Sequence, residues 1–305
     1  MSVPFPQGVA QETIRQGSTV LYAALGEVIV ERAGMVNLGL EGTMLTGACF
    51  GFIITNRTGS PYLGLLVAAI SGGLFNLVFG YLAVTRRANQ LAAGLTVLFF
   101  AYGLTAIAGF NYVGKRITSL AEWRLPGLSD IPGLGPVLFK GDIMIFAMGP
   151  AAVLVWYLLY RTRWGLNLRT VGESRTAAYA AGLSPERIQY EALFVGGLFG
   201  GLGGAQLSLF IASVWLEQMT AGKGFIAVAL VIFASWHPLR AIVGAALFGG
   251  SVALELQLQA HNAAIPPVLL DMLPYLLTLA VLVLWGRNRQ YQMPMGITEV
   301  FEGTA

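Results

Sequence analysis

Charge is what this chain of 305 residues has least of: Asp, Glu, Lys and Arg together make up only 11% of it. About 25% of the residues of an average soluble domain are charged. On the surface of such a domain, charged residues make up roughly a quarter to a third. Here 56% of the residues are hydrophobic, and 39 are glycine. This composition excludes an ordinary soluble protein and predicts a chain that lies largely in lipid, where glycines let helices pack closely.

Cysteine and the common catalytic motifs are also scarce or missing. The single cysteine, Cys49, excludes an intrachain disulfide and a CxxC metal site. No HExxH, GxSxG or Walker sequence occurs, and His237 and His261 lie apart at predicted span ends. The basic residues are scattered between apolar runs, which indicates membrane topology rather than a nucleic-acid surface. We therefore expect no enzyme, no cofactor, no bound metal and no nucleic-acid partner.

Long uncharged runs are what the sequence does contain. A bilayer core of about 30 Å is crossed by roughly 20 apolar residues in a helix. Four uncharged runs reach about that length, at 58–85, 88–114, 143–160 and 192–216. Five less regular apolar segments lie at 13–30, 42–56, 224–239, 241–254 and 272–286. Together they predict an all-α integral membrane protein, a polytopic bundle of about nine transmembrane helices, some short or broken, in one domain over 1–305.

Arginines orient the predicted bundle, because short cytoplasmic loops collect Arg and Lys. The connections 84–90 and 161–190 are rich in arginine, and the C-terminal tail begins with two more at 287 and 289. All three fall on one side if each intervening segment crosses once. This arrangement predicts a cytoplasmic C-terminus and an N-terminus outside. The connection 111–141 mixes both signs of charge with Pro and Gly, so we expect an extracytoplasmic loop there.

The segment 31–47, ERAGMVNLGLEGTMLTG, places polar residues and glycines between two apolar stretches. A carboxylate inside a membrane is costly enough to be a functional candidate, and Glu41 is one. On a helix, Asn37 would lie one turn before Glu41 on the same face. Two interpretations stay open at this point. Glu41 either lines a solute pathway or its gate, or it caps or pairs inside the bundle, with Arg32 as one possible partner.

The second polar segment, 167–194, contains the signals of a short helix between two spans. Ser174 is a candidate N-cap, Gly182 a left-handed stop, and Ser184 with Pro185 begins the next helix. A two-turn helix alone in water is marginal, so its Ala/Tyr face should pack against a partner protein. The alternative is a surface turn whose arginines rest on anionic lipid headgroups.

The glycine cluster 196–204, GGLFGGLGG, has GxxxG spacing three times over. This spacing favours close helix packing. The run superficially matches a dinucleotide-binding loop, but no strand precedes it, so we reject that interpretation.

Three stretches make the sequence recognisable: ERAGMVNLGLEGTMLTGACFG, VGESRTAAYAAGLSPERIQYEAL, and GFIAVALVIFASWHPLRAIVGAALFGG followed by PYLLTLAVLVLWGR. They resemble signature regions of bacterial ABC-import permeases, and more narrowly the nucleoside and simple-sugar branch of the superfamily that also holds the branched-chain amino acid permeases. The similarity runs from about Gln16 to Arg289.

The resemblance implies a multi-pass permease of the bacterial cell (inner) membrane that forms a translocation pathway for nucleosides, or otherwise simple sugars. It implies three partners: a second homologous permease, a cytoplasmic ABC ATPase that hydrolyses ATP, and an extracytoplasmic substrate-binding protein. The docking residues that match the family's loop are Gly172, Glu173, Ala177, Ala178 and Gly182. The pathway residues carried over are Asn37, Glu41, Gly42, Gly224 and Phe225.

A self-sufficient, ion-coupled secondary transporter is the alternative function. It would use partly buried carboxylates that bind protons or Na⁺, for which Glu27, Glu41, Glu255 and Asp271 are the candidates. The importer instead requires a docking loop. The loop is present in the sequence, whereas the carboxylates are spread near span ends, so the importer is favoured.

Overall fold

The computed structural model describes residues 5–118, 123–124, 127, 129, 131, 135–138, 140–261, 269, 272–285 and 293–302. Nearly all of these residues are helical. The α-helices are α1 (Phe5–Arg32), α2 (Leu40–Thr58), α3 (Pro61–Gly80), α4 (Gln90–Gly109), α5 (Gly135–Leu138), α6 (Ile143–Arg161), α7 (Arg163–Glu173), α8 (Arg175–Ala180), α9 (Pro185–Ala205), α10 (Lys223–Phe233), α11 (Pro238–Ala260), α13 (Leu273–Trp285) and α14 (Met295–Glu302).

Shorter elements extend or connect these helices. The π-helices η1 (Tyr81–Thr85) and η3 (Gln206–Ile211) continue α3 and α9, and the 3-10 helix η2 (Phe110–Tyr112) continues α4. Strands β1 (Trp123–Arg124) and β2 (Lys140–Gly141) form a small antiparallel pair.

Five helical stretches in the described ranges are long and apolar enough to cross a membrane: Pro61–Thr85, Gln90–Tyr112, Ile143–Arg161, Pro185–Ile211 and Pro238–Ala260. The first four coincide with the four uncharged runs, and the fifth contains the less regular segment 241–254. The all-α polytopic class is therefore confirmed. The count of nine crossings stays a prediction, because α10 has only 11 residues and α13 is described over 13.

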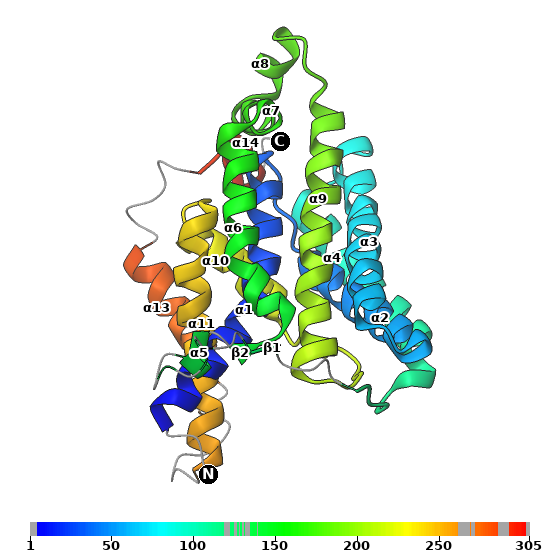
Figure 1. Cartoon of the computed structure of the whole chain (residues 1–305). Helices are drawn as coiled ribbons and strands as arrows, with labels where there is room; N and C mark the ends of the chain where they lie inside the picture. The colour runs from blue at the N-terminus through cyan, green and yellow to red at the C-terminus, as the bar shows by residue number, and fades with distance from the viewer. Residues whose placement is uncertain are drawn as a thin grey trace.

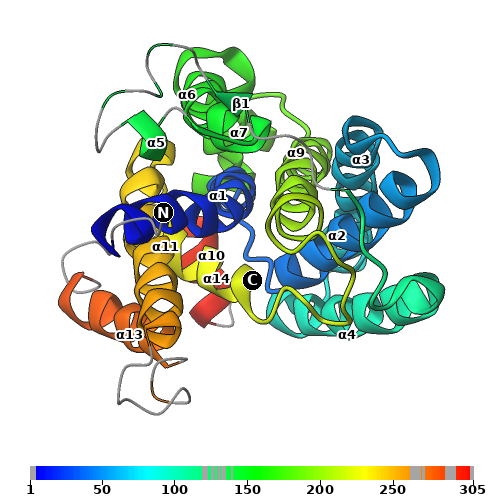
Figure 2. The same ribbon diagram turned by 60° about the horizontal axis from the view of Figure 1, so that its bottom comes forward.

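Helix α1 is the centre of the molecule. It has 28 residues, and every side chain from Gln16 to Glu31 is buried. Figure 2 shows α6, α9, α10 and α11 around it, and each of these helices packs against it. At about 1.5 Å per residue α1 is about 42 Å long, enough to cross a bilayer. A helix surrounded by protein rather than lipid can carry Glu27 and Glu31 inside the bundle.

The glycine cluster of α9 does what the GxxxG spacing predicts. A Cβ atom added at Gly196, Gly197 or Gly204 would lie within 2.8 Å of a backbone oxygen of α1, α3 or α2, respectively. Larger side chains would force these helices apart. The cluster therefore serves close packing between α9 and three neighbours.

The two ends of the molecule carry different elements. Figure 1 shows α7, α8, α14 and the described C-terminal end together at the top, and the start of α1, α5, β1 and β2 in the lower part. Helix α7 was not predicted. The Thr162 hydroxyl accepts the Gly165 N–H at 3.1 Å, which begins the helix, and Leu168 and Val171 are buried on one of its faces.

Candidate functional site

The candidate site is built around α10, a short helix held at both ends by the segment 31–41. At its N-terminal end, the carboxylate of Glu41 accepts the backbone N–H of Gly222 at 2.8 Å and of Gly224 at 2.5 Å. These N–H groups belong to the first turn of α10, which has no partners for them within the helix. Glu41 is therefore a helix cap supplied by another helix, and its charge complements the positive end of the α10 dipole.

The C-terminal end of α10 is held by the last two residues of α1. The Trp236 indole N–H donates to the Glu31 carboxylate, and Arg32 donates through Nε to the Trp236 carbonyl at 3.1 Å and through Nη2 to the Ser235 carbonyl at 3.4 Å. Ser235 and Trp236 have φ angles of +54° and +56°. Such left-handed backbone costs free energy in residues other than glycine, so these contacts support a strained turn.

Between α1 and α2, the backbone leaves the helix, and Asn37 organises the turn. Its Oδ1 accepts the Gly39 N–H at 2.9 Å, its Nδ2 donates to Asn76 Oδ1 at 2.6 Å, and its backbone N–H donates to Glu27 at 3.1 Å. The prediction that Asn37 and Glu41 share a helix face is wrong, because α2 begins only at Leu40. The local bond from Asn37 to Gly39 competes with helix here.

The structure also places the other three predicted pathway residues. A Cβ at Gly224 would lie 2.5 Å from the Glu41 Cα, so only glycine allows α10 to approach α2 this closely. Gly42 lies against Ala101 of α4. Phe225 is 37% exposed. Glu41 itself is buried and serves as a cap, as the second sequence interpretation allowed, and its partners are the α10 amides rather than Arg32.

The short helix α8 has the capping that the sequence predicted. The Ser174 hydroxyl accepts the Ala177 N–H at 3.2 Å, and Gly182 has a φ of +77°. Ser184 occupies the N-cap position of α9 without a side-chain bond. Within α8 only Ala178 is buried, and both Ala177 and Tyr179 are exposed.

The predicted docking residues divide into an exposed and a buried group. Glu173, Ala177 and Gly182 are exposed, whereas Gly172 and Ala178 are buried inside this chain. Gly172 packs against the turn at Gly34, where a Cβ on Gly34 would lie 3.1 Å from the Gly172 Cα. Buried residues cannot touch a partner, so their part is to fix α7 and α8 on the bundle.

A polar connection joins α8 to the end of α1, and sequence reasoning missed it. Arg175 donates to Gln189 Oε1 at 2.8 Å, and Gln189 Nε2 donates to the Ala33 carbonyl at 3.3 Å. The Gln189 side chain is 3% exposed. No clear sequence signal pointed to it, because Gln189 lies in the predicted connection 161–190, where a glutamine is not expected to be buried. Once buried, its amide must find hydrogen-bond partners.

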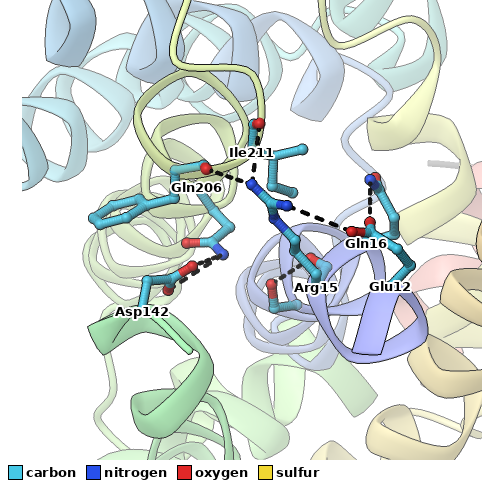
Figure 3. A network of polar contacts seen from close by, with 8 residues as sticks. Glu12, Arg15, Gln16, Asp142, Gln206 and Ile211 are labelled. Atoms are coloured by element: carbon cyan, nitrogen blue, oxygen red, sulfur yellow. Dashed lines mark hydrogen bonds and ion pairs between the residues drawn. The ribbon is translucent and has the colours of Figure 1, made fainter. Parts of the chain in front are cut away.

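A second polar cluster, shown in Figure 3, lies next to β2, which is in the lower part of Figure 1, away from α8. The Asp142 carboxylate caps α6 by accepting the N–H groups of Met144 and Ile145, and it also accepts Gln206 Nε2 at 3.1 Å. Burial raises the pKa of Asp142 above its usual value, although these hydrogen bonds oppose the shift. Arg15 donates to the Phe210 carbonyl at 2.9 Å, at the end of the π-helix η3. The cluster thus ties α1, α6 and η3 together.

The carboxylates required by the ion-coupled alternative are already engaged in hydrogen bonds where the structure describes them. Glu27 and Glu41 accept backbone N–H groups, and Glu255 of α11 accepts Gln259 Nε2 at 3.3 Å. Asp271 lies outside the described residues. No group of three His, Cys, Asp or Glu side chains within the described ranges could hold a metal ion.

Comparison with known proteins decides between the two functions. A family model described as the permease component of branched-chain amino acid transport systems matches residues 9–282. The chain belongs to this permease family. The resemblance drawn from the three signature stretches is thereby confirmed.

Three relatives extend the comparison over most of the permease. A Haloferax volcanii protein provisionally named as a glucose ABC transporter permease is 36% identical over 267 residues, covering 86% of this chain and 81% of the relative. The guanosine ABC transporter permease of Bacillus subtilis is 34% identical, covering 90% of each chain. The nucleoside ABC transporter permease of Lactococcus lactis is 34% identical, covering 87% of this chain and 88% of the relative.

The permease is therefore a multi-pass membrane subunit of an ABC transporter. Proteins of this family are transport subunits rather than enzymes, in agreement with the sequence prediction. A permease of this kind works with an ATPase and a substrate-binding protein. The ion-coupled alternative is not supported by these relatives.

Proposed function

We propose that this permease imports nucleosides, with simple sugars as the other candidate solutes. The names of the relatives support this range, because two are named for guanosine or nucleosides and one for glucose. The structural observation that carries the ATP-driven mechanism is α8, an exposed and capped short helix connected through Gln189 to the turn after α1. Neither a channel nor a self-sufficient carrier needs such a helix.

In this proposal α8 is the coupling helix that docks on the ATPase. Glu173, Ala177 and Gly182 present the docking surface, while Gly172 and Ala178 fix the loop 161–190 on the bundle. The end of the molecule with α7, α8 and α14 then lies in the cytoplasm, together with the C-terminus. The loop 111–141 lies outside the bacterial inner membrane and faces the substrate-binding protein. A second homologous permease completes the pathway, and residues 1–305 act as one domain.

The pathway residues act through α10. Asn37 shapes the turn beside it, Glu41 caps it, and Gly42 and Gly224 allow α2, α4 and α10 to approach one another. Phe225 is the one member of this group with a substantially exposed side chain. We expect movement of the 33–39 turn to be passed to α10, because both ends of α10 are bonded to the segment 31–41.

The decisive experiment is solute profiling with the partner proteins present. The permease is reconstituted in liposomes with its second permease, ATPase and binding protein, and uptake of radiolabelled guanosine and D-glucose is measured with and without ATP. ATP-dependent uptake of guanosine supports the proposal. Uptake of glucose alone assigns the permease to sugars, and uptake driven by an ion gradient without ATP contradicts the ABC mechanism.

A further inference from the structure

A cavity of about 230 Å³ lies between α1, α10, α11 and α13. Figure 2 shows these four helices grouped on one side of the bundle. The polar side chains that line the cavity are Gln16, Lys223, Glu255 and Tyr275, and Phe248 and Val252 are among its apolar walls. The Tyr275 hydroxyl donates to the Ala221 carbonyl at 3.2 Å, which links α13 to the start of α10.

The cavity is set back from the start of α1. Gln16 is the twelfth residue of α1, so it lies about 17 Å from the start of that helix at 1.5 Å per residue. Lys223 is the first residue of α10, and Glu255 lies five residues before the end of α11, so both charged side chains lie near helix ends and face the cavity. Their presence around one cavity therefore calls for a polar occupant.

Lys223 is the strongest indication of a ligand. It is partly buried, and its ammonium forms neither a hydrogen bond nor an ion pair within the described residues. The carboxylates of Glu41 and Glu255 are near enough to attract its charge. The oxygens of Glu41 are already bound to the Gly222 and Gly224 amides. The ammonium thus brings three donors to the cavity without a bonded acceptor.

We propose that this cavity binds the transported solute, and that the solute belongs to the neutral polyhydroxylated class, a monosaccharide or the ribose of a nucleoside. The inference rests on the proposed transport function. Hydroxyl groups accept from Lys223 and donate to Glu255, and the Gln16 amide can do both. The positive charge of Lys223 and the negative charge of Glu255 cancel in the lining of the cavity, which favours a neutral solute. The ring of Phe248 and the side chain of Val252 can contact the apolar face of the solute. The volume is below the roughly 300–1,000 Å³ of drug-sized sites, which suits a small molecule.

Solute protection of a cysteine in the cavity wall tests the site directly. Val252→Cys is introduced in the permease of the complete transporter, in which the native Cys49 is 0% exposed and should stay unlabelled. Labelling by a small maleimide is timed with D-glucose, guanosine or leucine present at millimolar concentration. We expect glucose, guanosine or both to slow labelling and leucine to leave it unchanged. Adding Lys223→Met should abolish the protection, whereas the exposed Lys115→Met should preserve it.

Uptake by single variants provides a second readout that needs no introduced cysteine. Loss of a hydrogen bond to a charged group corresponds to about a tenfold effect, so Lys223→Met should lower uptake to about a tenth of that of the unmodified transporter. Glu255→Gln should weaken uptake in the same direction, with the exposed Glu217→Gln as its control. If neither glucose nor guanosine slows labelling, and Lys223→Met takes up solute normally, the proposed site is wrong while the proposed function still stands. Absence of ATP-dependent uptake in the unmodified transporter overturns the proposed function instead.

Discussion

At the scale of single residues, Glu41 combines a buried charge with two backbone hydrogen bonds. A carboxylate can accept from both Gly222 and Gly224 because it has two oxygens, and the amides of a helix start are fixed in position. Its side chain is only 1% exposed. A group in this position contributes to the stability of α10 and, in the proposed function, to the pathway that α10 borders.

Substitution of Glu41 should therefore affect both stability and uptake. Glu41→Gln keeps one acceptor and turns an amide NH₂ toward the second backbone N–H, which leaves a buried donor unpaired at a cost of about 1–3 kcal/mol. Glu41→Leu loses both bonds and should be worse. Thermal unfolding in detergent and solute uptake measure the two effects. The exposed Glu217→Gln should be close to wild type. Normal uptake and unchanged unfolding of both Glu41 variants would contradict the capping role.

The effect of replacing a glycine should also depend on what surrounds it. The Cβ of an alanine at position 224 would lie 2.5 Å from the Glu41 Cα. Because extra atoms in a well-packed core cost about 1–3 kcal/mol, Gly224→Ala should destabilise the protein by that amount. Gly103→Ala is the matched control. No atom lies within 4 Å of a Cβ placed there in α4, so alanine should be neutral or stabilising by up to about 1 kcal/mol. Thermal unfolding of the two purified variants measures the difference. Equal stability would show that α10 can move away from α2 without cost.

At the scale of elements, α8 has an inner and an outer face that mutations can separate. Ala178 is 0% exposed and packs within the core, so Ala178→Asp buries a charge without a partner at about 3–5 kcal/mol. The amount of the Ala178→Asp variant in the membrane should therefore fall. Ala177 is exposed, so Ala177→Asp should fold normally but lose ATPase association and uptake. Membrane immunoblots and co-purification of the ATPase report the two outcomes. Normal transport by Ala177→Asp would exclude α8 as the docking helix.

The connection from Arg175 through Gln189 to the Ala33 carbonyl makes α9 a link between α8 and the end of α1. We expect Gln189→Leu to lower solute transported per ATP hydrolysed while the complex still assembles. Arg175→Met should do the same, and the double variant should be no worse than the stronger single one, since residues in one network couple by about 0.5–3 kcal/mol. Arg187→Met is the control, because the Arg187 side chain is 81% exposed and pairs with Glu191 on the same helix, outside the Arg175–Gln189 connection. An unchanged ratio of transport to hydrolysis in Gln189→Leu would refute the connection.

At the scale of the whole molecule, the two ends of the bundle should lie on opposite sides of the membrane. The arginine distribution orients the chain, and α7, α8 and the described C-terminal end share one end of the structure (Figure 1). Cysteines at Ser129 and Ser174 should therefore be labelled by a membrane-impermeant reagent from opposite sides, Ser129→Cys from outside and Ser174→Cys only after permeabilisation. The buried Cys49 is the silent background. Labelling of both from one side would invalidate the topology.

The sequence by itself determined the class, the long spans, the glycine packing and the capped short helix. These features depend on local properties: hydrophobic run length, residue size, and the preference of Ser and Gly for helix ends. The four uncharged runs correspond to helices, and Ser174 and Gly182 bound α8 with Gly182 just beyond its end. The signature stretches also carried enough information to identify the permease family.

Only the tertiary structure decided what the polar residues of these stretches bind. Glu41 and the α10 amides are more than 180 residues apart in sequence, as are Glu31 and Trp236. Asn37 leaves helical geometry because it bonds Gly39 and Asn76. The surroundings of Lys223 also depend on packing, because helices α1, α10, α11 and α13 together form the cavity that it lines. A buried polar group must find a partner, but its sequence position alone does not say which element brings one, because the choice is made by how the helices pack.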